Sequence, residues 1–344
     1  MRNLFYLPVI LLSILFFSCE NEPINKADPA NVIQVNSELY NLIERAAGND
    51  FENEITCIGF NYPFTLVIYD ENMDIIGYQP INSDIQFSEF LATLEEGKSI
   101  SLSYPITSIL DNGQPYEINN NEELKAAIDK CLQADTITTC NNILTENSCI
   151  WKVTHLEGPN NQYNNSYFEV SNYGNAGLNF NDESYIGTWV TYFIEDELHL
   201  NIFILGDENV SDDWNFDWKV VGFTDTEMEI ANGTDRFLLT KECHQPCVKF
   251  LFEECETEPG SQRAIFDLES YFECFFPLTG INNPETVIAT YFETYEDMLA
   301  RANPIGNLLY ENSINPQVIY IRFDDANTGE YVTFLPIILK AVQC

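Results

Sequence analysis

The sequence predicts a multidomain, mainly β protein: an α+β module followed by an antiparallel β-barrel and a β-sandwich. The chain has 344 residues, enough for two or three domains, and 45% of them are apolar. Residues 57–131 alternate hairpin and helix patterns, whereas short alternating strands follow one another from residue 150 onward. We expect these boundaries: a signal peptide at 1–18, a flexible tether at 19–35, the α+β module at 36–139, the barrel at 140–242 and the sandwich at 243–344.

The N-terminus has the order of a secretory signal. Arg2 precedes an apolar run, residues 4–17, that is too short to span a bilayer and ends at the small residue Ser18. Cys19 follows directly, and this junction resembles the lipobox of bacterial lipoproteins. The resemblance implies that the signal is removed before Cys19 and that acylation of this residue anchors the protein in a membrane. An ordinary signal peptide with an incidental cysteine is the alternative.

The residues after Cys19 concern localisation. Glu20 and Glu22 resemble the acidic export signal of Bacteroidetes lipoproteins, which directs a lipoprotein to the outer face of the outer membrane. The resemblance implies a lipid-anchored outer-membrane protein exposed at the cell surface, and a periplasm-facing protein is the alternative.

The charge balance is strongly acidic. Lys+Arg number 15 and Asp+Glu 54, which gives a net charge of −39 at pH 7. Such a field repels phosphate backbones and anionic head groups, so we expect neither nucleic-acid binding nor electrostatic membrane docking.

Ten cysteines in an exported chain indicate disulfides. If Cys19 is acylated, nine cysteines remain, so at least one has no partner within the chain. Cys57 and Cys131 bracket the α+β module and are its only cysteines, so we predict a disulfide between them. The full set of candidates is Cys57, Cys131, Cys149, Cys243, Cys255 and Cys274.

The α+β module begins with a predicted helix, Ser37–Ala47, that has Ser37 as N-cap and Gly48 as stop. Two similar halves follow, each a hairpin and then a helix, which predicts a duplicated ββα fold on one shared sheet. This pattern resembles a module of Bacteroidetes surface lipoproteins. The predicted core consists of Phe64, Leu66, Phe90, Leu91, Ile106, Leu124 and Ile128.

Eight short strands without a helix predict a small antiparallel barrel or sandwich between Ile150 and Glu242. The segments 151–153, 187–189 and 218–220 (WKV, GTW and WKV) resemble lipocalin-like domains of Bacteroidetes lipoproteins, which implies a lipocalin-like barrel. Its aromatic residues are candidates for a sugar or lipid cleft, or else for core packing: Trp151, Trp189, Tyr192, Trp214 and Trp218.

The C-terminal segment contains Phe266-Asp267-Leu268, Asn303-Pro304-Ile305 and the run 315–322, NPQVIYIR. These motifs resemble the β-sandwich repeats of large adhesins from gliding Bacteroidetes, which implies an Ig-like β-sandwich. The repeats usually have a cysteine where Glu330 stands. This departure leaves the pairing of Cys255 open, with Cys274 as a plausible partner.

Two motifs suggest metal binding but lack essential ligands. Asp70, Asn72 and Asp74 match the start of a calcium loop, but Ile81 occupies the position that requires a bidentate Glu. We therefore interpret this motif as a hairpin turn. Cys243-His244-Gln245-Pro246-Cys247 offers a zinc ion no evident fourth ligand, so we predict an oxidised turn between domains. We predict no metal and no cofactor.

No catalytic residue is predicted. His155 is expected to point into the barrel and His199 to face solvent, and neither accompanies a recognisable nucleophile motif. The first hypothesis is a non-catalytic surface lipoprotein that serves binding, adhesion or assembly with other envelope proteins or glycans. The alternatives are a carrier or sensor of a small lipid or sugar ligand in the barrel, and an envelope glycan hydrolase.

Overall fold

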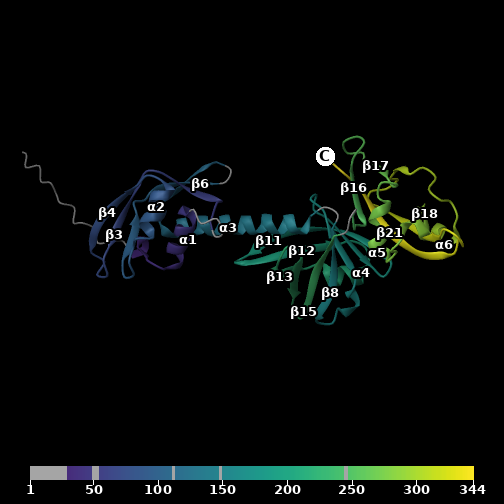
Figure 1. Cartoon of the computed structure of the whole chain (residues 1–344), viewed down its shortest axis with the longest axis horizontal. Coiled ribbons are helices and arrows are strands. Elements are labelled where there is room, and N and C mark those ends of the chain that lie inside the picture. Colours follow the sequence, from purple (N-terminus) through teal and green to yellow (C-terminus); the bar gives the residue numbers. More distant parts are fainter. Residues whose placement is uncertain (1–28, 49–53, 111–112, 147–148, 244–246) are drawn as a thin grey trace, which may run out of the picture. The chain divides into compact units, whose positions relative to one another are not determined.

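The computed structural model describes residues 29–48, 54–110, 113–146, 149–243 and 247–344 (Figure 1). The chain divides into two compact units, residues 1–132 and 133–344. The division lies inside helix α3 (Asn121–Leu144), several residues before the boundary expected from the sequence.

The first unit contains two separate sheets. One has the order β1-β5-β3-β4 and the other β2-β6-β7. The strands are β1 (Ile33–Gln34), β2 (Ile58–Asn61), β3 (Phe64–Tyr69), β4 (Ile75–Ile81), β5 (Ser99–Leu102), β6 (Ile106–Leu110) and β7 (Pro115–Ile118). The helices are the 3-10 turn η1 (Pro29–Asn31), α1 (Glu38–Ala47), α2 (Asp84–Leu91) and the start of α3.

The predicted N-terminal helix is confirmed as α1. Ser37 is its N-cap, and the Ser37 Oγ accepts a hydrogen bond from the Tyr40 backbone N–H at 3.3 Å. The two predicted hairpins are also present, as β3–β4 and β6–β7.

The single shared sheet was a wrong prediction. The fully buried strand β5 pairs with β3 on the side away from β4, so β3 has no free edge for the second hairpin. Strand β2 instead pairs with β6 and builds the second sheet.

The predicted core of this unit is confirmed. Leu124 and Ile128 of α3 are fully buried in one cluster with Leu66 of β3 and Leu91 of α2, and Phe90 packs against that cluster. The other predicted members, Phe64 and Ile106, also lie in it. The Tyr40 hydroxyl donates a hydrogen bond to the Leu91 carbonyl at 2.6 Å, which ties α1 to the end of α2.

The predicted disulfide between Cys57 and Cys131 is present. The two Cα atoms are 5.7 Å apart, and the residues are separated by 74 positions in the sequence. Cys57 directly precedes β2, and Cys131 lies in α3. The bond therefore joins the start of β2 to the helix that follows β7.

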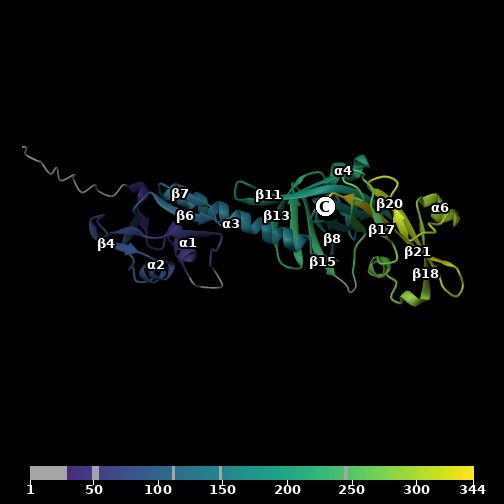
Figure 2. The same ribbon diagram turned by 90° about the horizontal axis from the view of Figure 1, so that it is seen from above.

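The second unit begins with a closed antiparallel barrel of order β10-β11-β12-β13-β14-β15-β8-β9 (Figure 2). Its strands are β8 (Cys149–Glu157), β9 (Tyr167–Val170), β10 (Asn175–Phe180), β11 (Glu183–Ile194), β12 (Glu197–Ile204), β13 (Asp217–Phe223), β14 (Glu227–Asn232) and β15 (Asp235–Cys243). The 3-10 turn η2 (Asn161–Tyr163) follows β8.

The expectation of a helix-free barrel was wrong, because α4 (Glu208–Trp214) lies between β12 and β13. The Asp207 side chain caps this helix by accepting from the backbone N–H groups of Asn209 and Val210. Trp214 at its end is fully buried. Large side chains fill the barrel interior: Trp151, Tyr163, Phe168, Trp214, Trp218 and Phe237.

The C-terminal module has a four-stranded sheet of order β16-β21-β20-β18 and a ribbon of β17 with β19. Strand β16 runs parallel to β21, and the other neighbours are antiparallel. Both sheets contribute to one core, through Phe266 of β17, Tyr310 of β19 and Ile321 of β20. The elements are β16 (Leu251–Cys255), β17 (Ile265–Asp267), η3 (Phe272–Cys274), α5 (Phe276–Thr279), η4 (Pro284–Thr286), β18 (Val287–Phe292), α6 (Tyr295–Ala300), β19 (Leu309–Glu311), β20 (Gln317–Asp325) and β21 (Tyr331–Val342).

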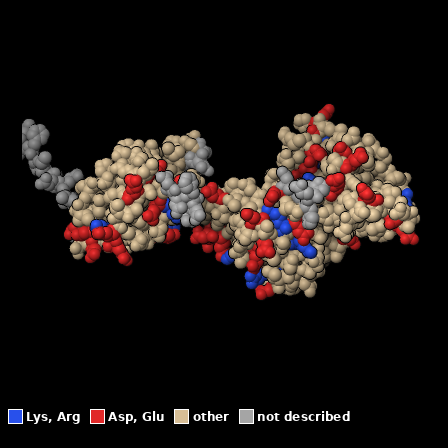
Figure 3. All heavy atoms as spheres, viewed as in Figure 1, with Lys and Arg blue, Asp and Glu red and all other residues tan. Residues whose placement is uncertain are grey.

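Acidic side chains predominate over basic ones on the face shown in Figure 3, in agreement with the composition. Such a surface favours solvation. Within the described ranges, no helix is both long and apolar enough to cross a membrane.

We predict that Leu124→Ala lowers the free energy of unfolding by about 2–5 kcal/mol, because it removes a fully buried side chain from the first unit's core. Urea denaturation measures the change. Ile85→Ala, at an exposed position of α2, is the control and should change the value by less than about 0.5 kcal/mol. Equal losses for the two variants would mean that α3 is not docked in this core.

Replacing both Cys57 and Cys131 by Ser should destabilise the first unit by about 4 kcal/mol, since the bond closes a long loop and restricts the unfolded chain. Peptide mapping under non-reducing conditions should first recover a fragment that joins the two residues. Freely alkylatable thiols at both positions in exported protein would contradict the prediction.

Candidate functional site

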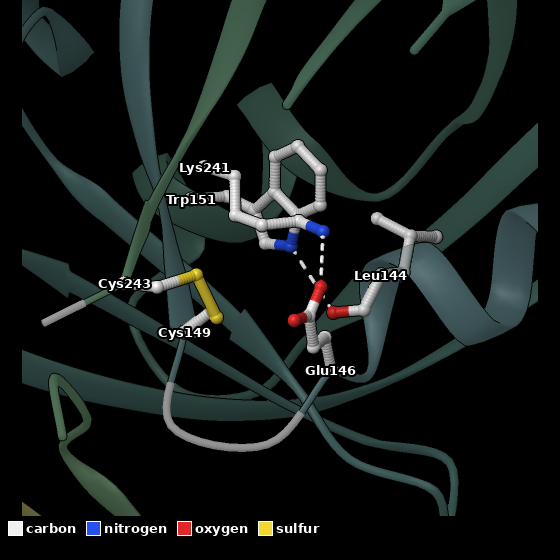
Figure 4. Close-up of a disulfide and its surroundings, with 6 residues drawn as sticks. All are labelled: Leu144, Glu146, Cys149, Trp151, Lys241 and Cys243. Atoms are coloured by element: carbon white, nitrogen blue, oxygen red, sulfur yellow. Dashed lines mark hydrogen bonds and ion pairs between the residues drawn. A yellow bond between two sulfur atoms is a disulfide. The ribbon is translucent and has the colours of Figure 1, made fainter. Parts of the chain in front are cut away.

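The seam of the barrel is the pairing of β8 with β15, and it carries a disulfide. The register places Cys149 opposite Cys243 and Trp151 opposite Lys241. Cys149 and Cys243 are bonded, with Cα atoms 4.3 Å apart (Figure 4). The bond therefore joins the two strands that close the barrel, at the rim next to the end of α3.

Lys241 is a buried cation at this rim. Strand alternation places it on the same side as the buried Phe237 and Leu239, and only 6% of its side chain is exposed. The Lys241 Nζ lies 2.7 Å from the Glu146 Oε2 and 5.5 Å from the centre of the Trp151 ring. This partner and the ring compensate for the cost of removing the ammonium group from water.

The same rim holds the end of α3. The Trp151 Nε1 donates to the Leu144 carbonyl at 3.1 Å (Figure 4). Cys140 and Leu144 are buried in the barrel core. Cys140 is the free cysteine of the described residues. Burial raises the pKa of its thiol to about 12, so it is an unreactive core residue and not a nucleophile.

A buried carboxylate lies where the barrel meets the C-terminal module. Glu169 is on β9, and only 6% of the residue is exposed. Its Oε2 accepts hydrogen bonds from the backbone N–H groups of Phe250 at 2.9 Å and Leu251 at 2.8 Å. Burial raises the pKa of Glu169 to about 8, although Lys249 and the two N–H groups act in the opposite direction.

A cavity of about 160 Å³ adjoins Glu169 and also reaches Glu146, Cys149, Lys249 and Glu253. Ligand pockets usually measure about 300–1,000 Å³, so this space is too small for an ordinary lipid or oligosaccharide. At about 30 Å³ for each water molecule, it has room for a few waters. The cavity therefore connects a buried acid to water and is not a ligand pocket of usual size.

The five aromatic residues named as cleft candidates are not brought together in one cleft, and Trp214 lies in the barrel core. Trp151, Trp189 and Trp218 are buried, and their indole N–H groups donate to backbone carbonyls of Leu144, Ser171 and Trp214 respectively. Tyr192 alternates with the buried Thr191 on β11, so it lies on the outer face, where its hydroxyl binds Asp217.

One predicted cysteine pairing was wrong. Cys243 does not pair with Cys247, because β15 places it opposite Cys149. Cys247 pairs with Cys274.

Cys255 pairs with Cys344 and not with Cys274. The parallel pairing of β16 with β21 places Cys255 beside Val342, two residues before the end of the sequence. The signal for this pair was the terminal cysteine after a strongly apolar strand.

The two histidines in the described part of the chain, His155 and His199, both lie against backbone carbonyls. The half-buried His155 stacks edge-on against Phe237, and its Nε2 lies 3.0 Å from the Gly158 carbonyl. His199 was expected to face solvent, yet 12% of its side chain is exposed. Its ring lies against the neighbouring strand, with Nδ1 3.2 Å from the Asp217 carbonyl.

The interpretation of Asp70 as a turn residue agrees with the structure, because its Oδ1 accepts from the backbone N–H groups of Asn72 and Asp74. Among the residues described, no group of three or more His, Cys, Asp or Glu side chains is arranged so that it could hold a metal ion. Cys19, Glu20, Glu22 and His244 lie outside the described residues.

The matches among solved structures are too weak to indicate a shared fold. Three complexes of the Helicobacter pylori β clamp match, each with a TM-score of 0.15. The complex with 5-chloroisatin is 10% identical and the match covers 89% of this chain and 81% of that one; the complex with a DNA ligase peptide is 10% identical, with 90% and 87% covered. The complex with 3,4-difluorobenzamide is 9% identical, with 89% and 83% covered.

No curated protein matches the chain. A family model does match residues 251–343, and its description is the Flavobacterium inter-domain disulphide bond domain. The C-terminal module is therefore similar to a flavobacterial domain, which supports a flavobacterial protein.

Proposed function

We propose that the protein is a lipid-anchored, non-catalytic component of the outer membrane that binds, adheres to or assembles with other envelope proteins or glycans at the cell surface. The signal, with Cys19 as acylation site, supports the anchor. The four disulfides among the described residues support an oxidising compartment outside the cytoplasm.

The observation that carries the proposal is that the barrel interior and the buried carboxylate of Glu169 are already occupied. Aromatic side chains fill the barrel, where a carrier would hold its ligand. The carboxylate of Glu169 is bound to two backbone N–H groups. Such a molecule offers partners its outer surface.

The outer face of β11 and β12 is one such surface. The exposed Val190 lies diagonal to Phe203, because Val190 pairs with Asn201 and Thr188 pairs with Phe203. Exposed Leu205 follows directly after the end of β12. Contiguous apolar side chains on a solvated face are typical of protein contact surfaces.

We predict that Cys19→Ala releases the protein from the membrane fraction and abolishes incorporation of labelled fatty acid, since acyl chains contribute about 0.8 kcal/mol for each buried methylene. Protease added to intact cells should degrade the wild type if it is surface-exposed. Equal labelling of wild type and Cys19→Ala would refute the anchor.

The adhesive role has its own test, in a strain that lacks the protein. Complementation with wild type should restore attachment to glycan-coated surfaces or the recovery of crosslinked envelope proteins. Phe203→Asp should fail to do so, because it places a charge in the apolar surface, while Thr188→Ser on the same face should act like wild type. Full activity of both variants would count against this surface.

A ligand carrier is the second candidate, favoured by one observation. The Trp214 indole N–H is buried in the barrel and has no hydrogen-bond partner among the described residues. If the barrel carries a ligand, titration of the mature chain with fatty acids or sugars should change its tryptophan fluorescence saturably. Trp214→Phe, which keeps a ring and removes the donor, should weaken that binding. We expect no saturable change, and no turnover of chromogenic glycosides.

A further inference from the structure

The C-terminal module covers the outer face of four barrel strands. Ile150 of β8, Tyr167 of β9 and Ile186 of β11 all contact the C-terminal core. In Figures 1 and 2, β21 accordingly lies beside the barrel, where it contacts β11. The contact is close-packed at Gly177 of β10, where an added Cβ would lie 2.8 Å from the Phe250 Cε2. The junction is thus an apolar contact with little room.

Glu169 places an acid inside this apolar contact. It lies next to Tyr167 and Phe168 on β9, and the two N–H groups that it binds belong to the segment that enters the C-terminal module. Separation of the module from the barrel would break both hydrogen bonds and expose the carboxyl group to water. The protonation state of Glu169 is therefore linked to closure of the junction.

The charged groups around Glu169 come from three elements. Lys249, just before β16, attracts the carboxylate, and Glu253 on β16 repels it. The Glu253 side chain accepts a hydrogen bond from Asn175 of β10, and the Lys249 Nζ lies 4.9 Å from the centre of the Phe252 ring. Glu146, after α3, lines the same cavity but is paired with Lys241. One cation thus faces two carboxylates at the contact itself.

The cavity gives protons a route to this acid. It reaches Glu169 from one side, together with Ser171 and Tyr173, and has room for a few water molecules. Glu169 can therefore exchange its proton without prior opening of the junction.

We propose that the junction between barrel and C-terminal module is a pH-sensitive latch, which neutral Glu169 keeps closed and ionised Glu169 loosens. The latch is a property of the fold and does not depend on the adhesive function proposed above.

The direction follows from the two states of the acid. In the closed junction burial raises the pKa of Glu169 to about 8, whereas an opened junction returns the carboxyl group to its ordinary pKa near 4.5. The contribution of Glu169 to the stability of the closed state is fully present below about pH 4.5, and it is lost as the pH rises to about 8. Between these limits the opening equilibrium should increase by up to tenfold for each pH unit.

Hydrogen–deuterium exchange of the mature chain tests the latch at the amides of Phe250 and Leu251. After correction for intrinsic exchange rates, their protection should fall at least about tenfold between about pH 5.5 and pH 7.5. Glu169→Gln keeps an acceptor for both N–H groups and cannot ionise, so its protection should not vary with pH. Glu253→Gln, the matched control in the same cavity, should retain the pH dependence.

A second variant tests the latch if Glu169→Gln folds poorly. Gly177→Val places a side chain against Phe250 and should hold the junction open, so protection at Phe250 and Leu251 should be low at every pH. Constant protection in the wild type, or wild-type pH dependence in Glu169→Gln, would overturn the proposal.

Discussion

The pairing of β8 with β15 is the constraint on which residues 133–344 depend. Alternation along β8 sends Trp151 into the barrel core and Ile150 into the core of the C-terminal module. A slip of one residue would exchange these two faces, and both cores would lose a buried side chain. The Cys149–Cys243 bond fixes the register at the last pair of this ladder. The barrel and the junction therefore depend on the same few residues.

The fold compensates two buried charged groups in different ways. Lys241 has a carboxylate partner in Glu146 and an aromatic face in Trp151, so its charge is retained at low solvent exposure. Glu169 has two backbone donors and the nearby cation Lys249, but Glu253 repels its charge, and burial dominates the balance. The first arrangement fixes the end of α3 to the rim. The second leaves an acid whose charge depends on the state of the junction.

Local sequence patterns were sufficient to predict the helices and strands but not which strands pair with one another. Capping at Ser37, the two hairpins and the eight barrel strands follow from periodicity and turn residues, and those were predicted. The extension of α3 to Leu144 was missed because most residues after Cys131 are polar or β-branched, and contacts of Cys140 and Leu144 with the barrel stabilise it. The prediction of one shared sheet was wrong for a similar reason, since the pairing of β5 with β3 depends on tertiary packing and not on a local pattern.

The candidate site shows the same limit. Glu169 occupies an outward position of a short strand and therefore resembles an ordinary solvated acid in the sequence. Its burial depends on Phe250 and Leu251, about 80 positions later, which no local pattern connects to it. Lys241 did leave a signal, because it continues the inward alternation of Phe237 and Leu239.

The distribution of disulfides explains why movement is expected at the junction and not within the modules. In the described part of the chain, each of the four bonds closes a module on itself: Cys57–Cys131 the first unit, Cys149–Cys243 the barrel, and Cys247–Cys274 with Cys255–Cys344 the C-terminal module. Such bonds restrict the unfolded state of each module and leave the contact between barrel and C-terminal module to apolar packing and hydrogen bonds. A contact without a covalent bond can open while both of its sides remain folded. Because Glu169 lies in that contact, its protonation is linked to a connection that no disulfide of the described residues crosses.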